Sequence, residues 1–214
     1  MYEAQFWFHA KRTGEVGQIF TSVYGSAAPT RVVRVLGAQA GGSWWAEQML
    51  LYNNTYQKVD AMAIAPYFGN DYGSQEMMST VQGWSVSTLL NKLTTQSVPE
   101  SLAQVKVSAG ICAKYKIKLL GYEGGQHLVG VGAPQDNNAI NNLFDAVNRN
   151  AGMLNLYTTY LNGWKQNGGG LFMHYVNCYP IQKWGRWGAM EYLGQPLSQA
   201  PKFDALQRYI EANR

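Results

Sequence analysis

The sequence has little charge and little cysteine. Only 14% of its 214 residues are charged, and the net charge of +4 is dispersed, without a block of Lys and Arg or a basic helical stripe. Nucleic-acid binding is therefore not expected, because it needs a basic footprint for the phosphates. The two cysteines, Cys112 and Cys178, lack the close spacing of a redox or zinc motif and leave the cellular compartment open.

Long apolar runs and metal-ligand motifs are also missing. No run of about 18 apolar residues occurs, so no membrane partner is expected, and residues 1–20 contain neither the apolar core nor the cleavage site of a signal peptide. The three histidines are scattered, with no H-x-x-x-H pair or carboxylate cluster, so we expect no metal. The G-x-S-x-G motif and the P-loop are absent as well, and we expect no cofactor.

Aromatic and apolar residues are plentiful instead. The chain is 46% hydrophobic and 13% aromatic, with 7 Trp and 14 Tyr. This is enough for a sizeable core, and we expect residues 1–214 to form a single partial domain. Charge-poor, aromatic-rich chains are common among sugar-binding proteins, because flat aromatic faces cover the apolar faces of pyranose rings, although large cores use the same residues.

Apolar periodicity predicts helices that alternate with strands. Helices are expected at residues 2–24, 43–53 with Ser43 as N-cap, 76–95, 100–115 after a break near Pro99, 137–166 in two pieces around Gly152, and 200–213. Strands are expected at residues 31–40, 58–69, 116–122 and 168–180. The order αβαβαβαβα predicts a parallel sheet with right-handed crossovers, and four such units are half of an eightfold barrel. An open doubly wound sheet is the alternative, but the loop after the first strand lacks its G-x-G-x-x-G fingerprint.

Polar residues follow every predicted strand, as they do where a barrel gathers its functional side chains. They are Gln39, Tyr67, Glu123 with Gln126 and His127, and Asn177. Glu123 directly follows an apolar strand and precedes two glycines. A carboxylate there is costly to desolvate and is normally retained only if it is paired or used, although a solvated turn is the alternative.

Three segments carry a resemblance to known proteins. YEGGQHLVG, VDAMAIAPYFG and WGAMEYLGQPLSQAPKFDALQRY resemble large bacterial proteins that are sometimes labelled cellulose-binding or carbohydrate-active. More broadly, nearly all 214 residues resemble the C-terminal half, strands five to eight, of a cellulase-like (β/α)8 retaining glycoside hydrolase. The resemblance implies an α/β fold in which parallel strands are surrounded by outer helices.

The resemblance also implies roles for two residues. Glu123, at the end of the seventh strand, matches the catalytic nucleophile, and Tyr67, near the end of the sixth, matches a tyrosine that hydrogen-bonds this carboxylate. A nucleophilic carboxylate must stay ionised, and a donor beside it keeps its pKa low. An ordinary core tyrosine is the alternative for Tyr67.

Half of the catalytic pair is expected outside this chain. Retention needs a second carboxyl group about 5 to 5.5 Å from the first, as general acid and base. The superfamily carries it as a Glu after an Asn at the end of strand four, and no Asn-Glu occurs here; Glu3 lies in a predicted helix and does not match it. We therefore expect this chain alone to be nearly inactive and to need an N-terminal half-barrel as partner.

The remaining candidates would hold a poly- or oligosaccharide substrate. They are Gln39, Gln126, His127, Asn177, Trp184 and Trp187. A Trp after strand eight often stacks on sugar in the superfamily, but packing is an equal alternative for both tryptophans. A structural role in the loop after the strand is likewise an equal alternative for His127 and Gln126. His174 and Asn177 should face opposite sides of the last strand, and Asn177 is preferred because it is nearer the carboxyl end.

Two other functions stay open. One is a non-catalytic carbohydrate-binding barrel in which Glu123 only accepts a hydroxyl hydrogen bond. The other is a half-barrel that pairs with itself or with a separate N-terminal half, because exposed parallel edges invite association. For the parent of a polysaccharide-acting chain, a secreted or periplasmic location is an expectation.

Overall fold

The structure, a computed structural model, describes residues 2–213 and divides into two compact units. Unit 1 comprises the residues up to Ala65, Ala103–Glu123 and Asn167–Met173. Unit 2 comprises Pro66–Leu102, Gly124–Gln166 and the residues from His174 onward. The chain thus enters unit 2 shortly after each of three strands, and the single domain expected from the sequence stays a prediction.

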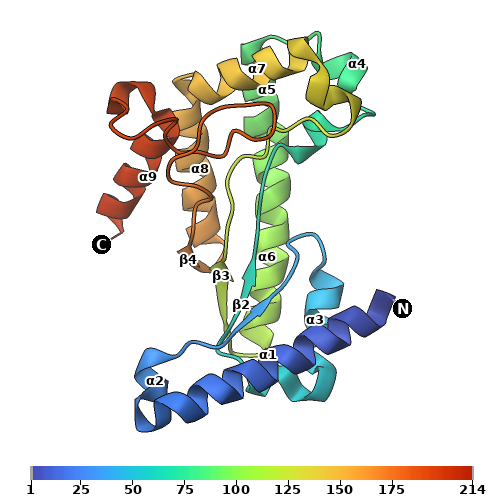
Figure 1. The fold of residues 1–214 in the computed structure, drawn as a ribbon, viewed down its shortest axis with the longest axis vertical. Coiled ribbons are helices and arrows are strands. Elements are labelled where there is room, and N and C mark those ends of the chain that lie inside the picture. Colours follow the sequence, from blue (N-terminus) through green and yellow to red (C-terminus); the bar gives the residue numbers. More distant parts are fainter. Residues whose placement is uncertain (1, 214) are drawn as a thin grey trace. The chain divides into compact units, whose positions relative to one another are not determined.

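Unit 1 is built on a parallel sheet whose strands are drawn as arrows in Figure 1. Its strands are β1 (Val35–Gly37), β2 (Ala61–Ile64), β3 (Lys118–Gly121) and β4 (Gly169–Phe172). All three pairings are parallel and the spatial order is β1-β2-β3-β4. The α/β class with parallel strands is therefore confirmed. Because the order never reverses, this sheet has no switch point of the doubly wound kind and is consistent with half a barrel.

Apolar burial and aromatic stacking hold unit 1 together. All four residues of β2 are buried, as in a strand covered on both faces. The helices of the unit are α1 (Tyr2–Tyr24), α2 (Ala28–Arg31), α3 (Ser43–Leu51) and the later part of α6 (Val98–Lys114). Phe6 of α1 stacks on Trp45 of α3 with ring centroids 4.5 Å apart. Arg34, before β1, binds the Asp60 carboxylate through two side-chain nitrogens at 2.9 and 2.7 Å and so fixes the start of β2.

Unit 2 is mainly helical. Its helices are α4 (Met78–Val81), α5 (Val86–Lys92), the first turn of α6, α7 (Asn138–Arg149), α8 (Gly152–Gln166) and α9 (Pro201–Ala212). Asn137 caps α7 by accepting hydrogen bonds from the backbone N–H groups of Ala139 and Ile140. In Figure 1, α8 in orange and α9 in red lie side by side. The core includes the fully buried side chains of Phe68, Phe144, Tyr157, Tyr160 and Trp164.

The strands are shorter than the sequence predicted. The structure has a three-residue β1 where a strand at 31–40 was expected, and β4 ends at Phe172 where a strand was expected to reach 180. The reason is that only the paired residues form a ladder, and the chain leaves unit 1 after Met173. His174 and Asn177 lie beyond the strand, so strand alternation does not place their side chains, and the choice of Asn177 stays a prediction.

Two helix boundaries also differ. Ser43 is the first residue of α3 and not its N-cap, which is Gly42. Pro99 does not break a helix but lies in the first turn of α6, after a π-helical turn at Leu93–Ser97. Proline lacks the N–H that would close a regular turn, and a π turn accommodates its loss. The helical material breaks earlier, and Ser85 caps α5 there by accepting from the Thr88 N–H.

Candidate functional site

Glu123 follows β3 by two residues and is the last residue of the Ala103–Glu123 segment of unit 1. The backbone before it is fixed, since the Tyr122 N–H donates to Ile64 O of β2 at 3.1 Å. Gly121 is needed there, because a Cβ would lie 2.7 Å from the Phe172 ring of β4. The Glu123 side chain is half-buried, and its charge adds to burial in raising the pKa of the neighbouring Tyr122 phenol. A carboxylate so placed can accept a hydrogen bond or attack an electrophile.

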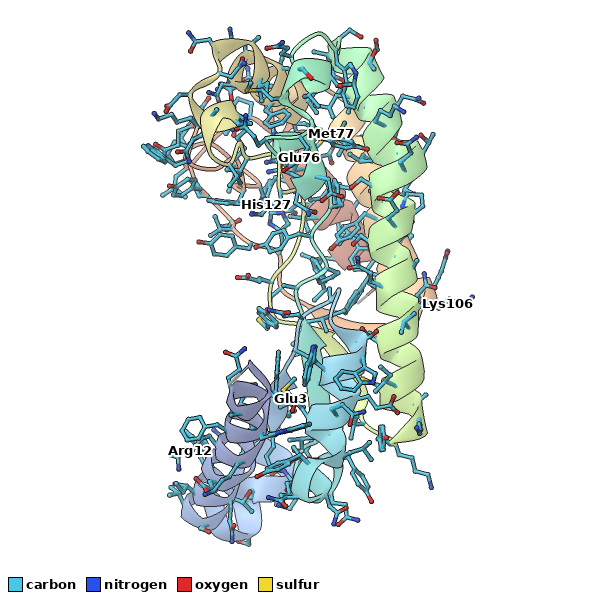
Figure 2. All side chains as sticks on the ribbon, turned by 90° about the vertical axis from the view of Figure 1, so that its right-hand side faces the viewer. Glu3, Arg12, Glu76, Met77, Lys106 and His127 are labelled. Carbon is cyan, nitrogen blue, oxygen red and sulfur yellow. The ribbon has the colours of Figure 1, made fainter. Side chains whose placement is uncertain are left out.

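The loops of unit 2 bring five ring side chains together, which we call the aromatic cluster: Tyr67, His127, Tyr175, Tyr179 and Trp187. Trp187 is its centre, with ring centroids 5.6 Å from His127, 5.8 Å from Tyr175 and 6.2 Å from Tyr179. Tyr67 packs edge-on against His127 at 5.3 Å. Figure 2 labels His127 among the side chains of this unit. Four of these rings are half-buried, and Tyr175 is exposed at the margin of the cluster. Exposed ring surface of this kind can pack against an apolar ligand face.

The loop that carries Trp187 requires glycine at two positions, Gly185 and Gly188. A Cβ at Gly185 would collide with the Trp187 ring, and a Cβ at Gly188 would collide with the backbone carbonyls of Tyr179 and Met190. The Trp187 Nε1 is buried and has no hydrogen-bond partner among the described residues. The ring of Trp187 is therefore mainly a packing element of the loop.

Trp184 is placed differently, since 56% of its surface is exposed. The Lys183 ammonium lies over its ring, 4.6 Å from the centroid, and is itself bound to the Asp136 carboxylate at 2.6 Å. One face of the indole is thus occupied by a cation. The exposed part of the ring is available to a ligand.

Arg186 anchors the loop between these two tryptophans, and its side chain is 0% exposed. Its guanidinium pairs with Asp145 and donates to Asn141 Oδ1 at 2.9 Å and Leu128 O at 3.2 Å. Its own carbonyl accepts from Gln126 Nε2 at 2.5 Å. Gln126 is 1% exposed, and its Oε1 accepts from the Leu128 N–H, so this amide is engaged at both ends in holding the loop.

Two further bases of the same unit have lowered pKa values. Lys202, 3% exposed, donates to Asn148 Oδ1 at 2.8 Å and to the Arg186 carbonyl at 2.6 Å. Burial lowers the pKa of Lys202 to about 7, with Glu191 opposing this shift and Arg186 adding to it. Burial, assisted by the Lys202 charge, lowers the pKa of His174 to about 3. The neutral His174 lies 3.3 Å from the Tyr157 hydroxyl, which also accepts from the Gln126 N–H.

The depressed pKa of Lys202 predicts a stability that rises with pH. Between pH 7 and 10.5 the unfolded chain keeps the Lys202 proton and the folded chain has released it, so raising the pH favours the folded state. We expect a gain of about 2 kcal/mol between pH 7 and pH 9 from this group. Urea unfolding of Lys202→Met should lack that part of the slope, while substitution of the exposed Lys165 by Met should keep it.

The contribution of Lys202 is the difference between the pH profiles of the wild type and Lys202→Met, because other groups also titrate between pH 7 and 10.5. Burial raises the pKa of the Cys112 thiol to about 11, which gives an opposite slope above pH 9 in all three proteins. Identical pH profiles for the wild type and Lys202→Met would contradict the assignment.

The structure brings together only some of the predicted site residues. Tyr67, His127 and Trp187 meet in the aromatic cluster. The exposed Asn177 lies on the loop after β4 that also carries Trp187, and its carbonyl accepts from the Met190 N–H. Glu123 and Gln39 belong to unit 1, and the pairing of Glu123 with Tyr67 stays a prediction. Sequence reasoning missed Tyr175 and Tyr179, whose close spacing in HYVNCYP was an available signal, and the anchor Arg186, which had none.

Comparison of the chain with protein-family models, curated proteins and solved structures found no match. Among residues 2–213, no helix is long and apolar enough to cross a membrane. Within the same residues, no three His, Cys, Asp or Glu side chains gather as they would around a metal ion.

Proposed function

We propose that this chain is part of a retaining glycoside hydrolase acting on a poly- or oligosaccharide, with Glu123 as its nucleophile. One observation carries the proposal. In the described chain, Glu123 is the one acidic residue among the five residues that follow each strand of the sheet. The carboxyl ends of parallel strands form the edge at which α/β and barrel enzymes carry their chemistry. We propose further that the sheet is half, strands five to eight, of a (β/α)8 barrel.

The proposed reaction has two steps. The Glu123 carboxylate forms a bond to the anomeric carbon as the glycosidic bond breaks, and a general acid gives a proton to the leaving oxygen. Water, deprotonated by the same group, then attacks the anomeric carbon and releases Glu123 as a carboxylate. We propose that Tyr67 donates a hydrogen bond to this carboxylate and that the acid/base comes from outside these residues.

The unit 2 loops support carbohydrate as the ligand. The exposed Trp184 and the Tyr175 edge of the aromatic cluster offer ring surface in the same long loop, and Asn177 offers an amide. Rings cover the C–H faces of a pyranose, and amides both donate to and accept from its hydroxyls. This combination favours a sugar over a wholly apolar ligand.

A second candidate is a non-catalytic carbohydrate-binding barrel. It is favoured by the lack of a second carboxylate within the five residues that follow each described strand of the sheet, since retention needs two. In that case Glu123 accepts a hydrogen bond from a sugar hydroxyl and no bond breaks. Glycan binding without turnover, in a protein that contains the complete barrel, would favour this candidate.

Trp184 provides a test of the carbohydrate part of the proposal. We expect the chain to be retarded in native gels that contain soluble polysaccharides such as hydroxyethylcellulose, xylan or glucomannan. Trp184→Ala should weaken this binding about tenfold, because a stacked ring is lost. Tyr24→Ala removes an exposed ring of α1 and should bind like the wild type. Unaltered migration of the wild type in every polysaccharide would argue against carbohydrate as the ligand.

A further inference from the structure

The loop that joins β1 to α3 in unit 1 presents an uncharged polar surface. The Gly41–Gly42 turn forms this loop, and the Gly42 N–H donates to Gln39 O at 3.1 Å. The loop follows the carboxyl end of β1, on the sheet edge where Glu123 follows β3. All of these residues belong to unit 1.

Two exposed glutamine amides flank the glycine turn. A Cβ on Gly42 would lie 3.4 Å from Gln39 Oε1, and a Cβ on Gly41 would lie 3.8 Å from Gln104 Nε2 of α6. The absence of side chains at both glycines leaves the backbone open between the amides. Each amide can donate and accept, which suits a rim of sugar hydroxyls.

Trp44 follows this turn by two residues, in the first turn of α3, and 59% of its surface is exposed. Its ring is fixed edge-on against Trp45, with centroids 4.5 Å apart and planes at 80°. Trp45 is in turn stacked on Phe6 and contacts Trp7 at 6.3 Å. Trp45 therefore packs α3 against α1, while Trp44 presents a large ring that is held in place but largely uncovered.

Glu47 is the one charged residue in the described α3 helix, and it is already paired. Glu47, one turn further along α3, is bound to Lys114 Nζ at 2.6 Å and to the Tyr115 hydroxyl at 3.0 Å. Its pKa is lowered by the Lys114 hydrogen bond, so it stays ionised within that pair. An indole with two amides and an open glycine turn matches a neutral pyranose, which has an apolar C–H face and a hydroxyl rim.

We infer that Trp44, Gln39 and Gln104 around the Gly41–Gly42 turn form a binding subsite for a neutral pyranose unit. Trp44 stacks on the sugar face, and the two amides bind its hydroxyls. The inference rests on the proposed carbohydrate function and adds a subsite within unit 1, on the sheet edge that carries Glu123.

Fluorine NMR of the 214-residue chain labelled with 5-fluorotryptophan tests this subsite. The chain has 7 tryptophans, and Trp44→Phe, Trp45→Phe and Trp184→Phe assign the three resonances that are followed. Titration with cellohexaose, xylohexaose and mannohexaose should shift the Trp44 resonance to saturation with at least one of them. Shifts of the Trp184 resonance report independently on unit 2.

Substitutions then measure what each side chain contributes at this subsite. Trp44→Ala should weaken binding about tenfold, as reported by the perturbed resonance of Trp45, while Trp44→Phe should retain most of it because a ring remains. Gln104→Ala removes one amide from the exposed surface of α6 and should weaken binding several-fold. Circular dichroism should show that all three variants stay folded, because Trp45 makes the packing contacts with α1.

The outcomes separate this inference from the function on which it rests. A Trp184 shift with an unmoved Trp44 resonance would overturn the subsite and leave the carbohydrate function standing. If no tryptophan resonance responds to any of the three hexasaccharides, the carbohydrate function itself fails. An unchanged affinity in Trp44→Ala would also overturn the subsite.

Discussion

Replacement of Glu123 by glutamine should abolish covalent capture of a 2-deoxy-2-fluoro glycoside by a protein that contains this chain within a complete barrel. The fluorine slows both steps of a retaining mechanism, and an activated dinitrophenolate leaving group needs no acid, so the sugar ester of the nucleophile accumulates. Glutamine has nearly the same shape but no nucleophilic carboxylate. In a protein with a complete barrel, turnover of a dinitrophenyl glycoside should fall by at least about 10³-fold.

Mass spectrometry of the digested protein measures this result. The wild type should gain the mass of one fluorosugar on the peptide that contains Glu123, and Glu123→Gln should gain none. Glu76→Gln is the matched control, because this exposed glutamate of unit 2 is far from β3 in the sequence and its loss should leave labelling intact. Capture on another residue, or equal capture in Glu123→Gln, would refute the nucleophile assignment.

Long periodic segments made most of the fold predictable from the sequence. The helices at 2–24 and 137–166 and the final helix appear close to the expected residues, because their apolar residues recur at helical spacing over several turns. In α7, Ile140, Phe144 and Val147 are all buried on one face. The alternation of helices and strands then required parallel pairing, which the structure has.

The limits of the strands were not predictable in the same way. A strand ends where its neighbour stops pairing, and that depends on the other chain segments. The segment after Phe172 is as rich in aromatic and β-branched residues as a strand, but it continues into the loops of unit 2. The side chains of His174 and Asn177 are consequently placed by loop contacts and not by strand alternation.

Candidate residues could be predicted from the sequence where a polar residue directly follows an apolar strand. They were missed where only the packing of the folded chain determines which side chains are exposed. Glu123 was visible because a carboxylate directly follows an apolar strand. Trp44 was hidden, because two adjacent tryptophans at a helix start have the same pattern as a buried pair, and only the structure separates the packed Trp45 from the exposed Trp44. Nothing in the sequence indicated that the charged residue between Trp184 and Trp187 would be buried, yet the Arg186 side chain is fully buried.

Arg186→Met should destabilise the protein by about 3 to 5 kcal/mol. Methionine fills part of the volume but leaves the Asp145 carboxylate and the carbonyl of Leu128 without the guanidinium that binds them. Arg186→Lys should recover little, because one ammonium cannot reproduce the planar fork that reaches Asp145 and Asn141 together. The free energy of unfolding in urea measures both variants.

The pair formed by Arg149 and Glu191 provides a matched control in the same unit. Arg149 binds the Glu191 carboxylate through two nitrogens, at 2.7 and 2.6 Å, but its side chain is exposed, so Arg149→Met should cost no more than about 1 kcal/mol. The double variant Arg186→Met, Asp145→Leu should recover part of the loss, since it removes the stranded carboxylate as well. Equal costs for Arg186→Met and Arg149→Met would show that the loop carrying Trp184 and Trp187 is held by its glycine and aromatic packing and not by this buried charge.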